Sequence, residues 1–184
     1  MPESLKGKLL IAGPHLVEGT FMRSIVLLCE HSAEGALGLI LNRPGKIPVR
    51  EAFPDFAGAS PDEALRCGGP VQPEAVFILH DREGVGGEQV GDGLWFAADV
   101  DSFERLKGLC ATMNPPRQRL YTGYSGWSGG QLESELARND WIVTDCPDLL
   151  PFEVGGLESW AHHLEGLGGT FALLAKAPID PTLN

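Results

Sequence analysis

Short runs of apolar residues, most of them too short for helices, predict a chain built largely from β-strands. The two clearest runs are Ser24–His31 (SIVLLCEH) and Ala36–Asn42 (ALGLILN), and the tight connection Ser32–Gly35 separates them. Because glycine closes that connection, we expect the two runs to form a β-hairpin. The first run is apolar on both faces, so it is expected in the middle of a sheet. Further strands are predicted at Lys8–Ala12, Ala64–Cys67, Ala75–His80, Leu94–Ala97, Arg119–Tyr124 and Trp141–Thr144.

The helices that the sequence predicts are short and irregularly placed. One begins at Asp101, where Glu104 completes a capping box and Gly108 ends the helix. Another covers Gln131–Arg138, and a final helix over Gly156–Leu167 carries an apolar stripe. The members of that stripe are Leu157, Trp160, Ala161 and Leu164.

Between these elements, turn-forming residues predict irregular segments. Several prolines follow the hairpin and predict an irregular segment, in which one helical turn is expected at Val49–Phe53. Asp81–Gly93 is predicted to be a mobile loop, and Gly126–Gly130 a glycine-rich turn. Strands dominate and helices do not alternate regularly with them, so the pattern favours a single compact α+β domain.

Composition narrows the classes of function. The length of 184 residues fits one domain, and the net charge of −11 argues against direct nucleic-acid binding. The basic residues Arg105, Lys107, Arg117 and Arg119 come closest to a basic patch, and we interpret them as scattered surface charges. With no apolar run long enough to span a membrane and no signal peptide, a cytoplasmic location is expected.

The sequence predicts neither a metal nor another cofactor. The four cysteines lie far apart without a C-x-x-C pair, which is typical of reduced thiols. His31, His80 and the pair His162-His163 show no metal-ligand spacing. The glycine-rich turn before Gln131 resembles neither a P-loop nor a dinucleotide-binding fingerprint, so nucleotide binding has no support.

Gly126-Trp127-Ser128-Gly129-Gly130 is a formal G-x-S-x-G between a predicted strand and a predicted helix. That context is required of a hydrolase nucleophile elbow, so a small serine hydrolase using Ser128 is one hypothesis. The opposing interpretation is structural, because Ser128 and Gln131 have the spacing of a capping box. The preceding chain also lacks the alternating strands and helices of a hydrolase sheet, which favours the structural interpretation.

Three segments together resemble the bacterial AlgH/YqgE family of uncharacterised proteins. They are Phe21–Pro44, Gly68–His80 and Gly123–Trp141, in the family's order and over nearly the whole chain. The resemblance implies an unusual α+β fold of bulged, twisted, mostly antiparallel strands with short helices around them. The AlgH name associates some members with regulation of alginate synthesis, so an indirectly acting transcriptional regulator is a further alternative. The family usually has glycine where this chain has Ser128, which weakens the hydrolase hypothesis.

The leading hypothesis is a non-enzymatic binding or regulatory protein that recognises a protein partner or a small ligand. Glycines, an aromatic side chain and amides can hold a ligand, whereas no set of nucleophile, base and orienting group is evident. Trp127 is the key candidate, because an aromatic residue in a turn either packs on the core or offers a flat contact surface. The candidate binding residues are Asn42, Gly68, Gly69, Pro70, Gly126, Trp127, Gln131 and Glu133.

Overall fold

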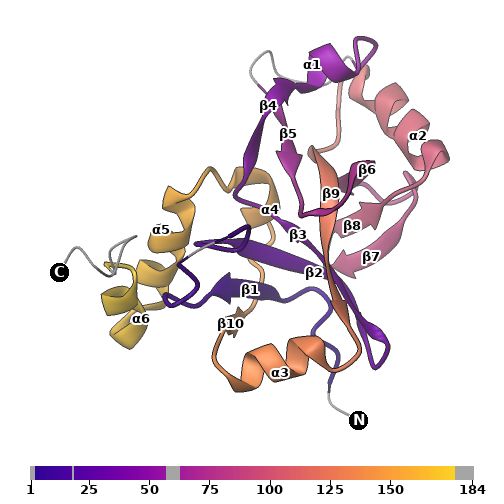
Figure 1. Cartoon of the computed structure of the whole chain (residues 1–184). Helices are drawn as coiled ribbons and strands as arrows, with labels where there is room; N and C mark the ends of the chain where they lie inside the picture. The colour runs from indigo at the N-terminus through magenta and orange to yellow at the C-terminus, as the bar shows by residue number, and fades with distance from the viewer. Residues whose placement is uncertain (1–2, 18, 57–62, 177–184) are drawn as a thin grey trace.

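The computed structural model describes residues 3–17, 19–56 and 63–176, in which short helices surround one large sheet (Figure 1). The strand order is β10-β1-β2-β3-β9-β6-β8-β7, and β5 joins it by pairing with β9 while β4 pairs with β5. Among the described strands, β5 and β9 are the one parallel pair, and the other pairs are antiparallel. These observations confirm the predicted α+β class and its mostly antiparallel sheet. The strands are β1 (Leu9–Ala12), β2 (Ile25–Ser32), β3 (Gly35–Ile40), β4 (Pro44–Pro48), β5 (Ala64–Cys67), β6 (Val71–His80), β7 (Glu88–Gly91), β8 (Leu94–Ala97), β9 (Gln118–Ser128) and β10 (Trp141–Thr144).

The predicted hairpin is formed by β2 and β3, which pair antiparallel from Val26 to Ser32. The register shifts between Leu28 and Glu30, so a β-bulge lies within the hairpin. β2 lies between β1 and β3, and its first five residues are buried. The prediction that this apolar run occupies the middle of the sheet is therefore confirmed.

β9 is the strand that holds the sheet together, because it pairs with β3, β5 and β6. It extends to Ser128, so the predicted glycine-rich turn at Gly126–Gly130 is wrong over its first three residues. Gly126 and Trp127 pair with Leu37 and Ala36 of β3. Glycine normally weakens a strand, but this pairing in the folded sheet overrides the local preference.

Six helices flank the sheet in the described residues. They are α1 (Val49–Ala52), α2 (Val100–Cys110), α3 (Gln131–Ala137), α4 (Leu150–Glu153), α5 (Glu158–Leu167) and α6 (Gly169–Leu174). The predicted start and end of α2 are wrong. Asp99 is its N-cap and accepts a 2.8 Å hydrogen bond from the Ser102 N–H, and the helix passes through Gly108 to Cys110. A single glycine costs only about 1 kcal/mol in a helix, so it need not end one.

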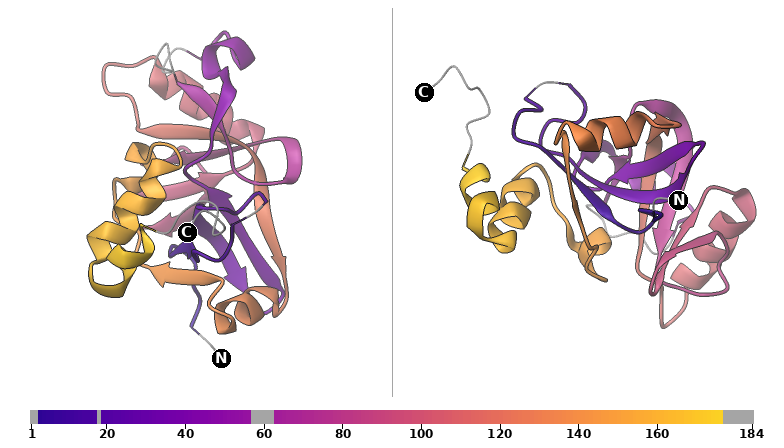
Figure 2. Two further views of the ribbon diagram at one scale, coloured as in Figure 1. Left: turned by 60° about the vertical axis from the view of Figure 1, so that its left-hand side comes forward. Right: turned by 90° about the horizontal axis from the view of Figure 1, so that it is seen from below.

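α5 and α6 lie at one end of the molecule and α2 at the other (Figure 2). The indole N–H of Trp160 on α5 donates a 2.8 Å hydrogen bond to the carbonyl of Ala12 at the end of β1. Trp160 and Leu164 are buried as the predicted stripe requires, whereas Leu157 precedes the helix and is exposed. None of the helices in the described ranges has the length and apolar character needed to cross a membrane.

Two strands of the structure, β4 and β7, were not predicted from the sequence. β4 contains prolines at both ends, and β7 lies in the segment predicted to be a mobile loop. β7 pairs only with β8, and its Glu88 and Gln89 are exposed. A polar edge strand lacks the apolar pattern by which strands are predicted, because its burial is slight.

Candidate functional site

Trp127 is part of the hydrophobic core rather than an exposed contact surface. Its side chain is only 5% exposed and lies edge-on to Trp141, with ring centroids 6.0 Å apart. The indole N–H groups of Trp127 and Trp141 both donate to Oε2 of Glu135 on α3, at 2.8 and 2.7 Å. One carboxylate thus satisfies two indoles and fixes α3 against the end of β9.

Gly68 and Gly69 bring together the three segments that carry the family resemblance. The Gly68 carbonyl accepts hydrogen bonds from the Ile40 N–H, at 2.9 Å, and from the Ser125 hydroxyl, at 3.0 Å. A Cβ at Gly69 would lie 2.2 Å from the carbonyl carbon of Tyr124, so only glycine fits there. Both glycines are buried and pack against β9, whereas Pro70 is exposed.

Asn42 is fully buried, and its side-chain amide bonds to the backbone beside β2. Its Oδ1 accepts the Ile25 N–H at 2.8 Å, and its Nδ2 donates to the Arg23 carbonyl at 2.9 Å. With both ends of the amide occupied and no exposed surface, Asn42 holds the start of β2.

Ser128 and Gln131 are in contact, but their geometry differs from the predicted capping box. The N-cap of α3 is Gly130, with a φ of +77°, and Ser128 is the last residue of β9. Oε1 of Gln131 accepts from the Ser128 N–H at 3.1 Å and from its hydroxyl at 3.3 Å. Ser128 has no positive φ, so it does not occupy the strained turn of a nucleophile elbow.

Glu133 anchors the side chain of His31. His31 Nδ1 accepts the Leu5 N–H at 2.9 Å, so the ring proton resides on Nε2, which lies 3.0 Å from Oε1 of Glu133. Hydrogen bonds from its own backbone N–H and from His31 lower the pKa of the Glu133 carboxyl. The pair connects α3, the hairpin and the N-terminal segment.

A groove of about 680 Å³ lies beside this pair, and we call it the hairpin groove. Of the eight candidate residues, Gly126 and Trp127 line it. Residues of the hairpin, Val71 of β6 and Tyr124 of β9 complete its walls, so all three family segments contribute. The full lining is Lys6, Glu30, His31, Ser32, Glu34, Gly35, Ala36, Leu37, Val71, Glu88, Tyr124, Gly126 and Trp127.

The hairpin groove is acidic. Of its charged side chains, Lys6 pairs with Glu88 at 3.0 Å. Within the described residues, Glu30 and Glu34 form no ion pair, and the Ser32 hydroxyl lowers the pKa of Glu34 by donating to it at 2.7 Å. Two exposed carboxylates therefore face the groove without an ion-pair partner among the described residues.

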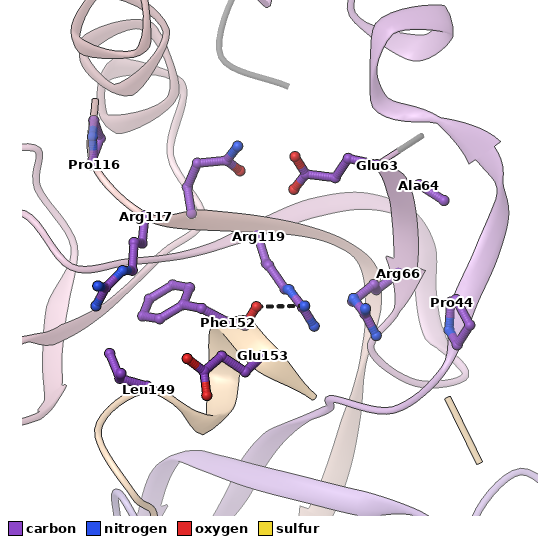
Figure 3. A pocket seen from close by; sticks show the side chains of 11 residues that line it. Pro44, Glu63, Ala64, Arg66, Pro116, Arg117, Arg119, Leu149, Phe152 and Glu153 are labelled. Carbon is purple, nitrogen blue, oxygen red and sulfur yellow. Dashed lines mark hydrogen bonds between the residues drawn. The ribbon is translucent and has the colours of Figure 1, made fainter. Parts of the chain in front are cut away.

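A second pocket, of about 610 Å³, opens at the other end of β9 (Figure 3). Arg66, Arg117 and Arg119 line it, although the sequence had indicated only scattered charges at Arg117 and Arg119. We call it the arginine pocket. The missed signal is the alternation Arg117-x-Arg119-x-Tyr121, which begins one residue before β9 and places Arg119 and Tyr121 on one face of that strand. Because Arg66 pairs with Tyr121 in the parallel register, it joins the same face.

Two further histidines, His80 and His163, have structural partners. His80 is buried, stacks on Trp95 and lies 3.0 Å from the Gly86 carbonyl, and His163 lies 3.3 Å from the Thr144 hydroxyl. Across residues 3–17, 19–56 and 63–176, no three His, Cys, Asp or Glu side chains are grouped as metal ligands.

The fold and the site define an α+β protein in which a surface pocket lies near each end of the central strand β9. Residues 9–172 match the family model described as AlgH-like, and the chain belongs to this family. A UPF0301 protein of Chlorobium luteolum is 38% identical over 97% of this chain and 94% of its own length. A UPF0301 protein of Chlorobium limicola is 36% identical over 97% of this chain and 95% of its own length.

Two solved structures have the same fold. The solution structure of the AlgH protein from Pseudomonas aeruginosa matches with a TM-score of 0.72 and 29% identity, covering 97% of this chain and 96% of that one. The crystal structure of protein DIP2367 from Corynebacterium diphtheriae matches with a TM-score of 0.76 and 22% identity, covering 96% and 93%.

Proposed function

We propose that this protein is a non-enzymatic binding protein that holds a positively charged partner or ligand in the hairpin groove. The observation that carries the proposal is the convergence of all three family segments on this groove. Its volume is in the range of small-molecule sites, which are about 300–1,000 Å³. Glu30 and Glu34 supply negative charge, and Tyr124 supplies an aromatic face, a combination that favours a cationic group.

The serine hydrolase alternative has less support. The Ser128 hydroxyl is directed to Gln131, and none of its hydrogen bonds in the described residues involves a histidine. A nucleophilic serine needs an adjacent base to remove its proton. Regulation of transcription, if it occurs, would act through a partner protein, because the net charge of −11 opposes contact with DNA.

The proposal is tested with a labelled hexalysine peptide and with spermidine as defined cationic probes. We expect saturable binding that weakens as salt is added, because the attraction is between exposed charges. The charge-reversed variant Glu30→Lys/Glu34→Lys should bind about tenfold or more weakly, measured by fluorescence anisotropy for the peptide and calorimetry for spermidine. Binding of either probe that depends on these two residues supports the proposal.

The matched control is Glu83→Lys/Glu165→Lys, which reverses the same amount of charge at two exposed residues outside the groove. It should retain most of the affinity. Equal losses in both variants would mean that the probes respond only to net charge. That result, or the absence of saturable binding by either probe, would contradict the proposal.

A further inference from the structure

The arginine pocket concentrates positive charge in an acidic protein. Three of the chain's 14 lysines and arginines line this one pocket, although the net charge is −11. Figure 3 shows Arg117, Arg119 and Arg66 following one another across it, with Phe152 beside Arg119. Two carboxylates, Glu63 and Glu153, also lie on its walls.

The guanidinium groups of Arg66 and Arg119 are fixed by neutral partners. Arg119 donates to the carbonyls of Phe152 and Val154, both at 2.6 Å. Arg66 donates from Nη1 to the carbonyls of Leu41, at 2.8 Å, and Gly155, at 2.9 Å. Carbonyl groups orient a guanidinium without cancelling its charge, and each group retains further N–H donors.

None of the three arginines forms an ion pair in the part of the chain that is described. Burial, and next the charge of Arg119, lower the pKa of Arg66, which indicates two cations held close together. Arg117 has no side-chain hydrogen bond among the described residues, and its guanidinium is free to contact an occupant.

A second observation points to the same place. In the described residues, two buried side-chain polar atoms lack a hydrogen-bond partner, Oε1 of Gln118 and the hydroxyl of Tyr121. Gln118 lines the pocket, whereas Tyr121 lies in the core behind it, two residues after Arg119 on β9. Unsatisfied buried groups are rare in folded proteins, and each calls for an explanation such as a bound water, ion or ligand.

We propose that the arginine pocket is a binding site for a small organic anion that carries carboxylate or phosphate groups. The planar guanidinium of arginine donates paired hydrogen bonds to such oxyanions. Leu149 and Phe152 give the pocket an apolar wall for the carbon skeleton, and the volume of about 610 Å³ accommodates a metabolite-sized molecule. This site is independent of the hairpin groove and needs a ligand of opposite charge.

The test is a calorimetric titration of the full chain with citrate, pyrophosphate and inorganic phosphate, at constant ionic strength set with sodium chloride. We expect saturable binding of at least one probe. Citrate alone would indicate a carboxylate ligand, a phosphate probe alone a phosphorylated one, and both a general oxyanion site; each result supports the proposal. No saturable binding by any probe would overturn it.

Arg117→Ala is the diagnostic variant, because its side chain makes no hydrogen bond whose loss would destabilise the described fold. It should weaken binding about tenfold or more while the thermal midpoint without probe stays unchanged. Arg138→Ala, which removes an exposed arginine after α3, is the charge-matched control and should bind as the wild type does. Equal affinity of Arg117→Ala and wild type would place the anion elsewhere and refute the assignment.

Discussion

At the scale of single residues, several side chains that the sequence indicates as binding candidates instead stabilise the fold. Trp127 lies in a glycine-rich segment, yet it is buried and its indole N–H is bonded to Glu135. The side-chain amide of Asn42 is likewise hydrogen-bonded to the backbone at both ends. The residues that we propose to contact a ligand are instead exposed acidic groups at the hairpin and arginines near the start of β9.

Glu135→Ala should be among the most destabilising changes on α3. It leaves the indole N–H groups of Trp127 and Trp141 without their acceptor, and each unsatisfied buried donor costs about 1–3 kcal/mol. We expect urea denaturation to show a loss of about 2–5 kcal/mol in the free energy of unfolding. The exposed Glu165→Ala should change it by less than about 0.5 kcal/mol. Equal stability of the two variants would show that the shared carboxylate is unimportant.

At the scale of elements, short helices are positioned by side chains from distant strands. α4 has four residues and no side-chain cap, so it cannot be stable by itself. The guanidinium of Arg119 on β9 bonds the carbonyls of Phe152 and Val154 and fixes this helix against the sheet. The position of α4 therefore depends on a side chain of β9.

Arg119→Lys should loosen α4 while it keeps the charge. An ammonium group cannot reproduce the two-pronged contact with the carbonyls, so we expect a loss of about 1–3 kcal/mol in stability. Hydrogen–deuterium exchange should become faster across residues 150–156 and remain unchanged in β1 and β2. The control Arg138→Lys should alter neither region, and unchanged exchange in the Arg119 variant would contradict the anchoring role.

At the scale of the whole molecule, β9 connects the two pockets. Arg119 and Trp127 are eight residues apart on this strand, which corresponds to about 26 Å along its axis. Its ends thus carry an arginine pocket and an acidic groove within one sheet. The stability of the whole fold also depends on pH through groups that the sheet buries.

Burial lowers the pKa of His80 and His163 from the ordinary value of 6.5. Between that value and their lower folded values, the unfolded chain binds more protons, so stability is full above about pH 6.5 and falls as the pH drops below it. His80→Gln should therefore lose less stability than wild type between about pH 7.5 and pH 5.5. Acidification also relieves repulsion among the excess carboxylates, so the diagnostic quantity in urea denaturation is the difference between the two proteins. Identical pH dependence of both would exclude His80 from this role.

The sequence by itself determined the features that depend on local pattern. Apolar runs identified the hairpin and its central position, because burial on both faces requires apolar residues at consecutive positions. Periodicity located α3 and the buried face of α5, and three segments identified the family. The α+β class follows from the same patterns.

Only the tertiary structure decided which side chains meet. Glycine composition indicated a turn at Gly126, but pairing with β3 keeps that segment in a strand. No local pattern connects Arg66 with Arg119, because 52 intervening residues separate them, and the parallel pairing of β5 with β9 brings them together. Polar edge strands such as β7 also lack the apolar pattern from which a strand is predicted. The same physical reason applies to the Gly126 segment, to the two arginines and to β7. Which strands pair in a sheet depends on the packing of the whole chain, and a short stretch of sequence does not determine that packing.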